Sequence, residues 1–152
     1  MRNVIVLSLL LVAAACSTGS QVSQKAAHIP LPEITIISHT DLTDIPVIST
    51  AVPAHFEFRI VNQADVPITL RSIDLVALGQ PGIRVQSKHL PYTTVIDPHT
   101  VQSVDFLTTA AIPDPGSPTR QAPVQLRAVA LFDSSDGSLE KVVVQQLRLD
   151  SE

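Results

Sequence analysis

The side chains best suited to chemistry in this chain are a single cysteine and five histidines, namely Cys16, His28, His39, His55, His89 and His99. A cysteine beside a base can act as a nucleophile, and a pair of nearby histidines can hold a metal ion. No two of these histidines lie within four residues of each other, so the sequence offers no local pair of ligands. We therefore expect scattered surface histidines, with no metal site, no cofactor and no catalytic residue.

Two short segments look like functional sequences but lack the spacing that the chemistry needs. Residues 133–140, DSSDGSLE, do not have the ligand spacing of a calcium loop, so a solvated hairpin turn is predicted there. Residues 97–99, DPH, bring a carboxylate near an imidazole, but no nucleophile motif such as G-x-S-x-G accompanies them. A proline-led turn is the prediction for that segment, and the chain is not expected to be an enzyme.

The position of Cys16 indicates a role outside catalysis. It follows an apolar run from Val4 to Ala15 that only Ser8 interrupts, and Arg2 is the only charge before it. A charged start, a short apolar run and small residues at its end are the parts of a secretory signal peptide. The run is shorter than the roughly 20 residues that span a membrane. We therefore predict a signal peptide over residues 1–15.

The residues Ala13-Ala14-Ala15-Cys16 resemble the lipobox of bacterial lipoproteins, although Ala13 stands where leucine is more usual. The resemblance implies that Cys16 is lipidated on its thiol, becomes the mature N-terminus and is usually acylated on its amino group as well. A lone cysteine in an exported protein cannot form an internal disulfide, which agrees with this role. Each buried methylene contributes about 0.8 kcal/mol, so two or three chains such as palmitate anchor a protein firmly.

The same resemblance predicts where the protein resides. In lipoproteins an Asp directly after the cysteine commonly causes retention at the inner membrane, and this chain has Ser17 there. The expected location is the bacterial cell envelope, on the outer membrane and facing the periplasm. The expected partners are the membrane, through the lipid, and another envelope protein.

Composition excludes nucleic acid as a partner and limits the chain to one domain. The net charge is −4, and the chain holds four Phe, one Tyr and no Trp. An acidic chain without a basic cluster does not attract phosphate backbones, and few aromatic rings are available for bases to stack on. Residues 16–32 are mostly polar and end in two prolines, so they are predicted to be a lipidated tether that reaches about 20 Å.

Beyond the tether the sequence predicts strands and no long helix. Strict alternation places Phe56, Phe58 and Ile60 on one face of a strand, with His55, Glu57 and Arg59 on the other. The apolar phase slips between Leu70 and Ile73, which predicts a β-bulge or bend, and Asp136-Gly137 predicts a hairpin turn. The segments expected to form strands are 33–38, 54–62, 67–78, 83–87, 93–96, 101–107, 124–133 and 139–149.

About seven short strands separated by turns predict an all-β fold, an antiparallel immunoglobulin-like β-sandwich over residues 33–150, with a small barrel as the alternative. The segment FEFRIVNQADVPITLRSIDL resembles the central motif of water-stress/LEA14-type domains, in which a strand ends in Asn and a Pro-hydrophobic pair starts the next. Asn62 and Pro67-Ile68 carry this resemblance, which covers residues 54–107 and implies a fibronectin- or immunoglobulin-like sandwich without catalytic residues. The alternative for Asn62 is a left-handed turn residue.

Three functions remain open from the sequence. The first is a surface-tethered, non-catalytic binding or assembly module, which acts through loops at one end or through a strand edge. The second is a carrier of a small apolar ligand or lipid between the sheets, and the third is an enzyme of unrecognised type. The proline-rich loop IPDPGSPTRQAP (112–123) is expected either to present Arg120 for binding or merely to connect the two sheets.

Overall fold

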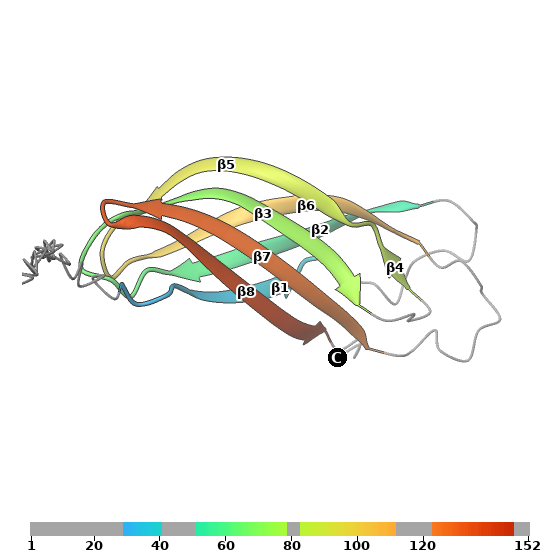
Figure 1. Ribbon diagram of the computed structural model, residues 1–152. Coiled ribbons are helices and arrows are strands. Elements are labelled where there is room, and N and C mark those ends of the chain that lie inside the picture. The colour runs from blue at the N-terminus through green and yellow to red at the C-terminus, as the bar shows by residue number, and fades with distance from the viewer. Residues whose placement is uncertain (1–28, 41–50, 79–82, 112–122, 148–152) are drawn as a thin grey trace, which may run out of the picture.

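The computed structural model describes residues 29–40, 51–78, 83–111 and 123–147. They form eight strands: β1 (Glu33–Ser38), β2 (Val52–Val61), β3 (Ile68–Leu78), β4 (Arg84–Val85), β5 (Lys88–Ile96), β6 (Val101–Ala111), β7 (Val124–Ser134) and β8 (Gly137–Leu147). Every pairing is antiparallel, and the strand orders are β1-β2-β6-β4 in sheet A and β5-β3-β7-β8 in sheet B (Figure 1). The described part of the chain contains no helix long and apolar enough to cross a membrane.

The predicted β-sandwich is confirmed, and each of the eight predicted segments contains a strand. Without the two-residue β4, the strand orders correspond to A-B-E facing C′-C-F-G, the fibronectin-like variant of immunoglobulin-like sandwiches. The largest difference lies in β5, which begins at Lys88 rather than at residue 93. Pro91 lies inside this strand, and an edge position tolerates it because no neighbouring strand needs the missing N–H there.

The core lies between the two sheets and is built from the alternating faces of the strands. Phe56, Phe58 and Ile60 of β2 are each 0 % exposed, as the alternation predicted. Phe106 on β6 and Phe132 on β7 are equally buried, so all four phenylalanines of the chain lie in this core. Burial of these large apolar side chains supplies most of the driving force for packing the two sheets together.

The predicted irregularity in β3 is a real shift of register. Pairing with both β5 and β7 shifts between Leu70 and Ser72. The extra residue lets Leu70 and Ile73 both face the core, although they are an odd number of positions apart. The phase slip in the sequence therefore marked a β-bulge.

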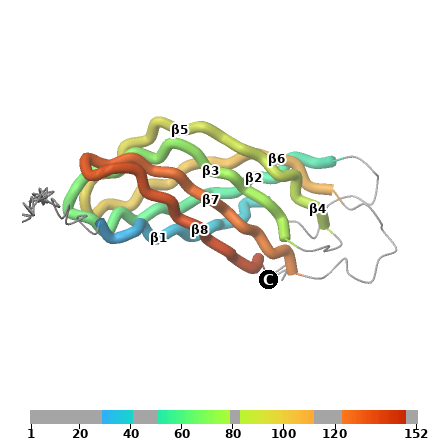
Figure 2. The backbone as a smooth tube through the Cα atoms, viewed as in Figure 1, coloured from blue at the N-terminus to red at the C-terminus, as the bar shows by residue number. Residues whose placement is uncertain are grey.

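The two ends of the sandwich differ, and we name them by where the chain enters. The tether end holds the start of β1 at Glu33 and the short connections 62–67, 97–100 and 135–136 (Figure 1). The distal end holds the strand ends that flank the two longest connections of the sequence, 39–51 and 112–123. Figure 2 shows both sheets running along the same axis between these ends. Ten to eleven residues of strand make this distance about 35 Å.

Asn62 lies at the tether end and joins the two sheets. Its Nδ2 lies 2.9–3.2 Å from the carbonyl oxygens of Val66, Ile96 and Asp97, and its Oδ1 accepts a hydrogen bond from Ala64 N. The alternative of a left-handed turn residue is wrong, because His99, with φ 57°, is the only non-glycine residue of the described ranges with positive φ. Asn62 follows the end of β2 without a positive φ, and its side chain satisfies backbone groups of both sheets.

The last hairpin forms as predicted, with its turn one residue earlier than Asp136-Gly137. Ser135 and Asp136 form a two-residue turn, and Ser134 pairs with Gly137. Gly137 has φ 128°, a conformation that a side chain would make unfavourable. The segment that superficially resembles a calcium loop is therefore a tight hairpin.

Candidate functional site

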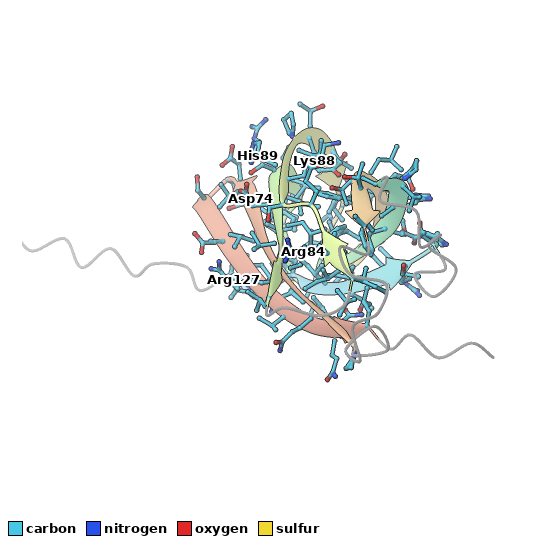
Figure 3. All side chains as sticks on the ribbon, turned by 90° about the vertical axis from the view of Figure 1, so that its right-hand side faces the viewer. Asp74, Arg84, Lys88, His89 and Arg127 are labelled. Atoms are coloured by element: carbon cyan, nitrogen blue, oxygen red, sulfur yellow. The ribbon has the colours of Figure 1, made fainter. Side chains whose placement is uncertain are left out.

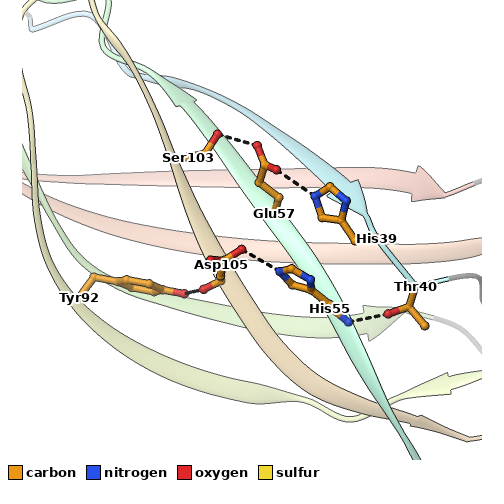
Figure 4. Close-up of polar contacts among 7 residues, drawn as sticks. All are labelled: His39, Thr40, His55, Glu57, Tyr92, Ser103 and Asp105. Atoms are coloured by element: carbon orange, nitrogen blue, oxygen red, sulfur yellow. Dashed lines mark hydrogen bonds and ion pairs between the residues drawn. The ribbon is translucent and has the colours of Figure 1, made fainter.

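The outer face of sheet A gathers five polar side chains from three neighbouring strand segments. We call His39, His55, Glu57, Ser103 and Asp105 the histidine–carboxylate cluster (Figure 4). The β2–β6 register places Glu57 directly opposite Asp105, and the amide of His39 donates to the carbonyl of His55. Residues that are far apart in sequence therefore become neighbours because they alternate on the same face of paired strands.

Each carboxylate of the cluster is bonded to one imidazole. His39 Nε2 lies 2.9 Å from Glu57 Oε2, and His55 Nε2 lies 2.7 Å from Asp105 Oδ1. The two rings also contact each other, with centroids 5.0 Å apart and planes tilted by 38°. Thr40 Oγ1 accepts the backbone N–H of His55, which holds the end of β1 against β2. Two facing carboxylates repel, and the imidazoles offset that repulsion.

The Ser103 hydroxyl donates to Glu57 Oε1 over 2.6 Å. This hydrogen bond makes the largest contribution to holding the pKa of the Glu57 carboxyl below its usual range, and the hydrogen bond with His39 makes the second largest. Glu57 therefore stays ionised in mildly acidic solution. The cluster therefore keeps the Glu57 carboxylate ionised on the outer face of sheet A.

The order of these contacts does not match a nucleophilic triad. In a triad the serine hydroxyl bonds to the imidazole, and the carboxylate holds the far side of that ring. Here the Ser103 hydroxyl bonds directly to the Glu57 carboxylate, and His39 lies on the other side of that carboxylate, so the order of a triad is absent. No three His, Cys, Asp or Glu side chains of the described residues converge as metal ligands. The cluster presents hydrogen-bonding groups and carboxylates on the outer face of sheet A.

Tyr92 connects this cluster to sheet B. It lies on β5, and its hydroxyl donates to the backbone carbonyl of Asp105 over 2.7 Å. Burial, with a smaller contribution from the Asp105 charge, raises the pKa of Tyr92 to about 12. The phenolate is disfavoured because it would be poorly hydrated and would face a carbonyl and a carboxylate.

Tyr92 is the only tyrosine of the chain, and there is no tryptophan, so tyrosinate absorbance reports this residue alone. We expect a titration midpoint near 12 in the folded protein and about 10 in denaturant. Because the folded pKa is raised, the unfolded state ionises first, and stability should decline as pH rises from about 10 to 12. A folded-state midpoint at the denatured value would contradict the Tyr92–Asp105 contact.

The four described histidines all bind carboxylates, although the sequence predicted only scattered surface positions. His89 Nδ1 lies 2.7 Å from Asp74 Oδ1, and His99 Nε2 lies 2.9 Å from Asp65 Oδ1. Asp74 and His89 lie together near the rim of the sandwich in the end-on view (Figure 3). The contact of His39 with His55 was not predicted from the sequence. Antiparallel pairing of segments 33–38 and 54–62 brings the two residues together, so the register of that pairing is the signal that could have predicted it.

Two residues with predicted roles, Cys16 and Arg120, lie outside the described residues. The loop 112–123 does connect β6 in sheet A to β7 in sheet B, as its connector role requires. Its role in binding stays a prediction. His28 also lies outside the described ranges.

Neither a protein-family model nor a curated protein matches the sequence. Among solved structures, the chain is similar to Northeast Structural Genomics Consortium target SoR45, with TM-score 0.51, 11 % identity, and coverage of 78 % of this chain and 85 % of that one. It is equally similar to the putative ApaA protein of Bordetella pertussis, with TM-score 0.51, 13 % identity, and coverage of 78 % and 91 %. A putative late embryogenesis abundant protein with a β fold aligns at TM-score 0.44 and 17 % identity, covering 81 % and 72 %. At these identities the likeness to the first two structures shows the fold alone.

Proposed function

We propose that this chain is a lipid-anchored module of the bacterial cell envelope that binds another envelope protein and performs no catalysis. Cys16 carries the anchor, and residues 17–32 form the tether. The outer membrane, facing the periplasm, is the proposed location. The kinship with water-stress/LEA14-type domains, which residues 54–107 indicate, belongs to the same proposal.

The difference between the two ends of the sandwich carries this proposal. The chain enters β1 at Glu33, where the neighbouring connections are short and Asn62 closes the end. The longest connections, 39–51 and 112–123, start and finish at the distal end. A lipid at Cys16 would hold the tether end near the membrane and direct the distal end about 35 Å away from it. This arrangement suits a protein that presents its loops to a partner.

The filled interior favours a surface role over a carrier role. Phe56, Phe58, Phe106 and Phe132 are each 0 % exposed between the sheets, surrounded by aliphatic side chains. An apolar ligand between the sheets would have to displace these side chains, and core packing of this kind resists added volume. Binding through loops or edges needs no such rearrangement.

The anchor is tested by replacing Cys16 with Ser. We expect the variant to remain unprocessed and to lose labelling by an alkyne analogue of palmitate, because the acylated thiol is gone. Ser17→Ala should be labelled as the wild type is, which separates loss of the thiol from a general effect on export. Equal labelling of Cys16→Ser and wild type would overturn the anchor.

Photo-crosslinking in living cells tests which end of the sandwich contacts the partner protein. A benzophenone side chain placed at the exposed distal positions Arg84 or Gln125 should crosslink to a partner protein. The same group at the exposed tether-end positions Gln63 or Ser135 should give lipid or no adducts. Equal protein adducts from both ends would contradict the proposed orientation.

A further inference from the structure

The edge of β1, and the edge of β6 beyond its two-residue pairing with β4, are both covered by groups from other parts of the chain. Gln145 of β8 bonds the edge of β1 in both directions: Ile36 N donates to its Oε1 over 2.8 Å, and its Nε2 donates to Ile36 O over 2.5 Å. Gln145 therefore supplies the donor and the acceptor that a neighbouring strand would otherwise provide. This edge of β1 is closed to strand addition at its centre.

The edge of β6 is covered in the same way. Tyr92 Oη donates to Asp105 O and Lys88 Nζ donates to Leu107 O, both over 2.7 Å, while Gln86 N donates to Thr109 O over 2.8 Å. Successive edge carbonyls of β6 therefore have donors. The edge strand of sheet B on this side, β5, contains Pro91 and pairs irregularly with β3, two features that also prevent strand addition.

The other edge strand of sheet B, β8, has none of these features. It pairs with β7 over all eleven of its residues without a register shift or a proline. The Ser134–Gly137 pair closes a two-residue turn, so Gly137 and every second residue after it bond to β7. The N–H and C=O groups of Ser138, Glu140, Val142, Val144 and Gln146 therefore face the free edge. No group of the described residues bonds to that edge.

The side chains along β8 define what would fit beside it. Val142 and Val144 point outward and are 43 % and 52 % exposed, opposite Val129 and Arg127 of β7. Lys141, on the opposite face, is partly buried, and it forms no ion pair with a described carboxylate. A strand added beside β8 would have side chains on both of its faces. Those on the outer face would lie beside Val142 and Val144, and one on the inner face would lie beside Lys141.

We propose that the free edge of β8 binds an extended segment of a partner protein, which adds as a further strand. The segment carries apolar residues facing Val142 and Val144 and an acidic residue facing Lys141. This site lies along the side of the sandwich, and the choice of a partner protein over a second copy rests on the proposed lipid anchor. A second copy of the chain fits less well, because antiparallel pairing of two β8 strands would direct the two tether ends in opposite directions.

The probe is a fluorescent nine-residue peptide, TVTVEVTVT, with alternate residues N-methylated so that only one of its edges can pair. We expect it to bind the full mature chain in a saturable manner, about fivefold more tightly than the lysine counterpart TVTVKVTVT. Lys141→Glu should reverse this preference. Val144→Pro should abolish binding without unfolding the chain, because the Val144 N–H faces the free edge, whereas Val144→Thr should retain it.

Three results would overturn the proposal: no binding up to the solubility limit, binding unchanged by Val144→Pro, or a charge preference that Lys141→Glu does not alter. Sedimentation of the chain without the peptide tests whether a second copy of the chain occupies the edge. A dimer that Val144→Pro dissociates would assign the edge to a second copy instead. None of these results depends on acylation of Cys16, so failure here is distinguishable from failure of the anchor.

Discussion

Replacing Asn62 with Ala is expected to lower the free energy of unfolding by about 2–4 kcal/mol. The change removes the Nδ2 donor that serves the carbonyl groups of Val66, Ile96 and Asp97. It also removes the acceptor of the Ala64 amide. Asn62 is 1 % exposed, so water cannot simply take over these bonds. Urea unfolding followed by circular dichroism measures the effect.

Two further variants make the Asn62 test specific. Gln63→Ala alters an exposed neighbour with one long bond to Glu33 and should stay within about 0.5 kcal/mol of wild type. Asn62→Asp keeps the acceptor but turns a carboxylate toward carbonyl oxygens, which raises the pKa of the new carboxyl above its unfolded value. Its loss of stability relative to wild type should therefore be smaller at pH 4 than at pH 7. A neutral effect of Asn62→Ala would show that the two sheets do not depend on this contact.

Replacing Phe58 with Ala is expected to lower the free energy of unfolding by about 3–5 kcal/mol. Phe58 is 0 % exposed, lies in the middle of β2 and contacts the ring of Phe106, with centroids 5.5 Å apart and planes tilted by 53°. The substitution leaves a cavity between two sheets that are held apart by other large side chains and cannot close around it. Chemical unfolding of both proteins under one condition gives the difference.

The neighbouring residue Arg59 serves as the matched control for Phe58. It lies one position along the same strand, points to solvent and forms no ion pair with a described residue. Arg59→Ala should change stability by no more than about 0.5 kcal/mol. Comparable losses at positions 58 and 59 would mean that β2 does not present one face to the core.

Local patterns in the sequence were enough to predict the strands and their buried faces. The alternation in Phe56, Phe58 and Ile60 repeats every two residues, and only a strand places such residues on one side. The slip between Leu70 and Ile73 likewise indicated the bulge, since a regular strand cannot bury both. Turn chemistry at Asp97–Thr100 and near Gly137 separated the strands, and both turns are present.

Local patterns did not predict features that depend on which strands become neighbours in the sheets. The first half of β5 was not predicted because it contains Pro91. A proline is excluded from a central strand but tolerated in an edge strand, and the sequence does not show which of the two β5 is. For Asn62 the sequence offered a strand-ending motif residue or a left-handed turn residue, and neither predicted its bonds to Ile96 at the end of β5 and to Asp97, more than thirty residues away.

The strand content, the buried faces and the turns of this protein were determined by its sequence alone, because each depends on residues within a few positions of one another. The contact of His39 with His55 and the bonds of Gln145 to Ile36 were decided only by the tertiary structure. Gln145 and Ile36 are 109 residues apart and belong to different sheets. Such contacts arise from the pairing register and from how the sheets pack, and no short-range periodicity records either one. The free edge of β8 is likewise visible only after every other strand has been placed.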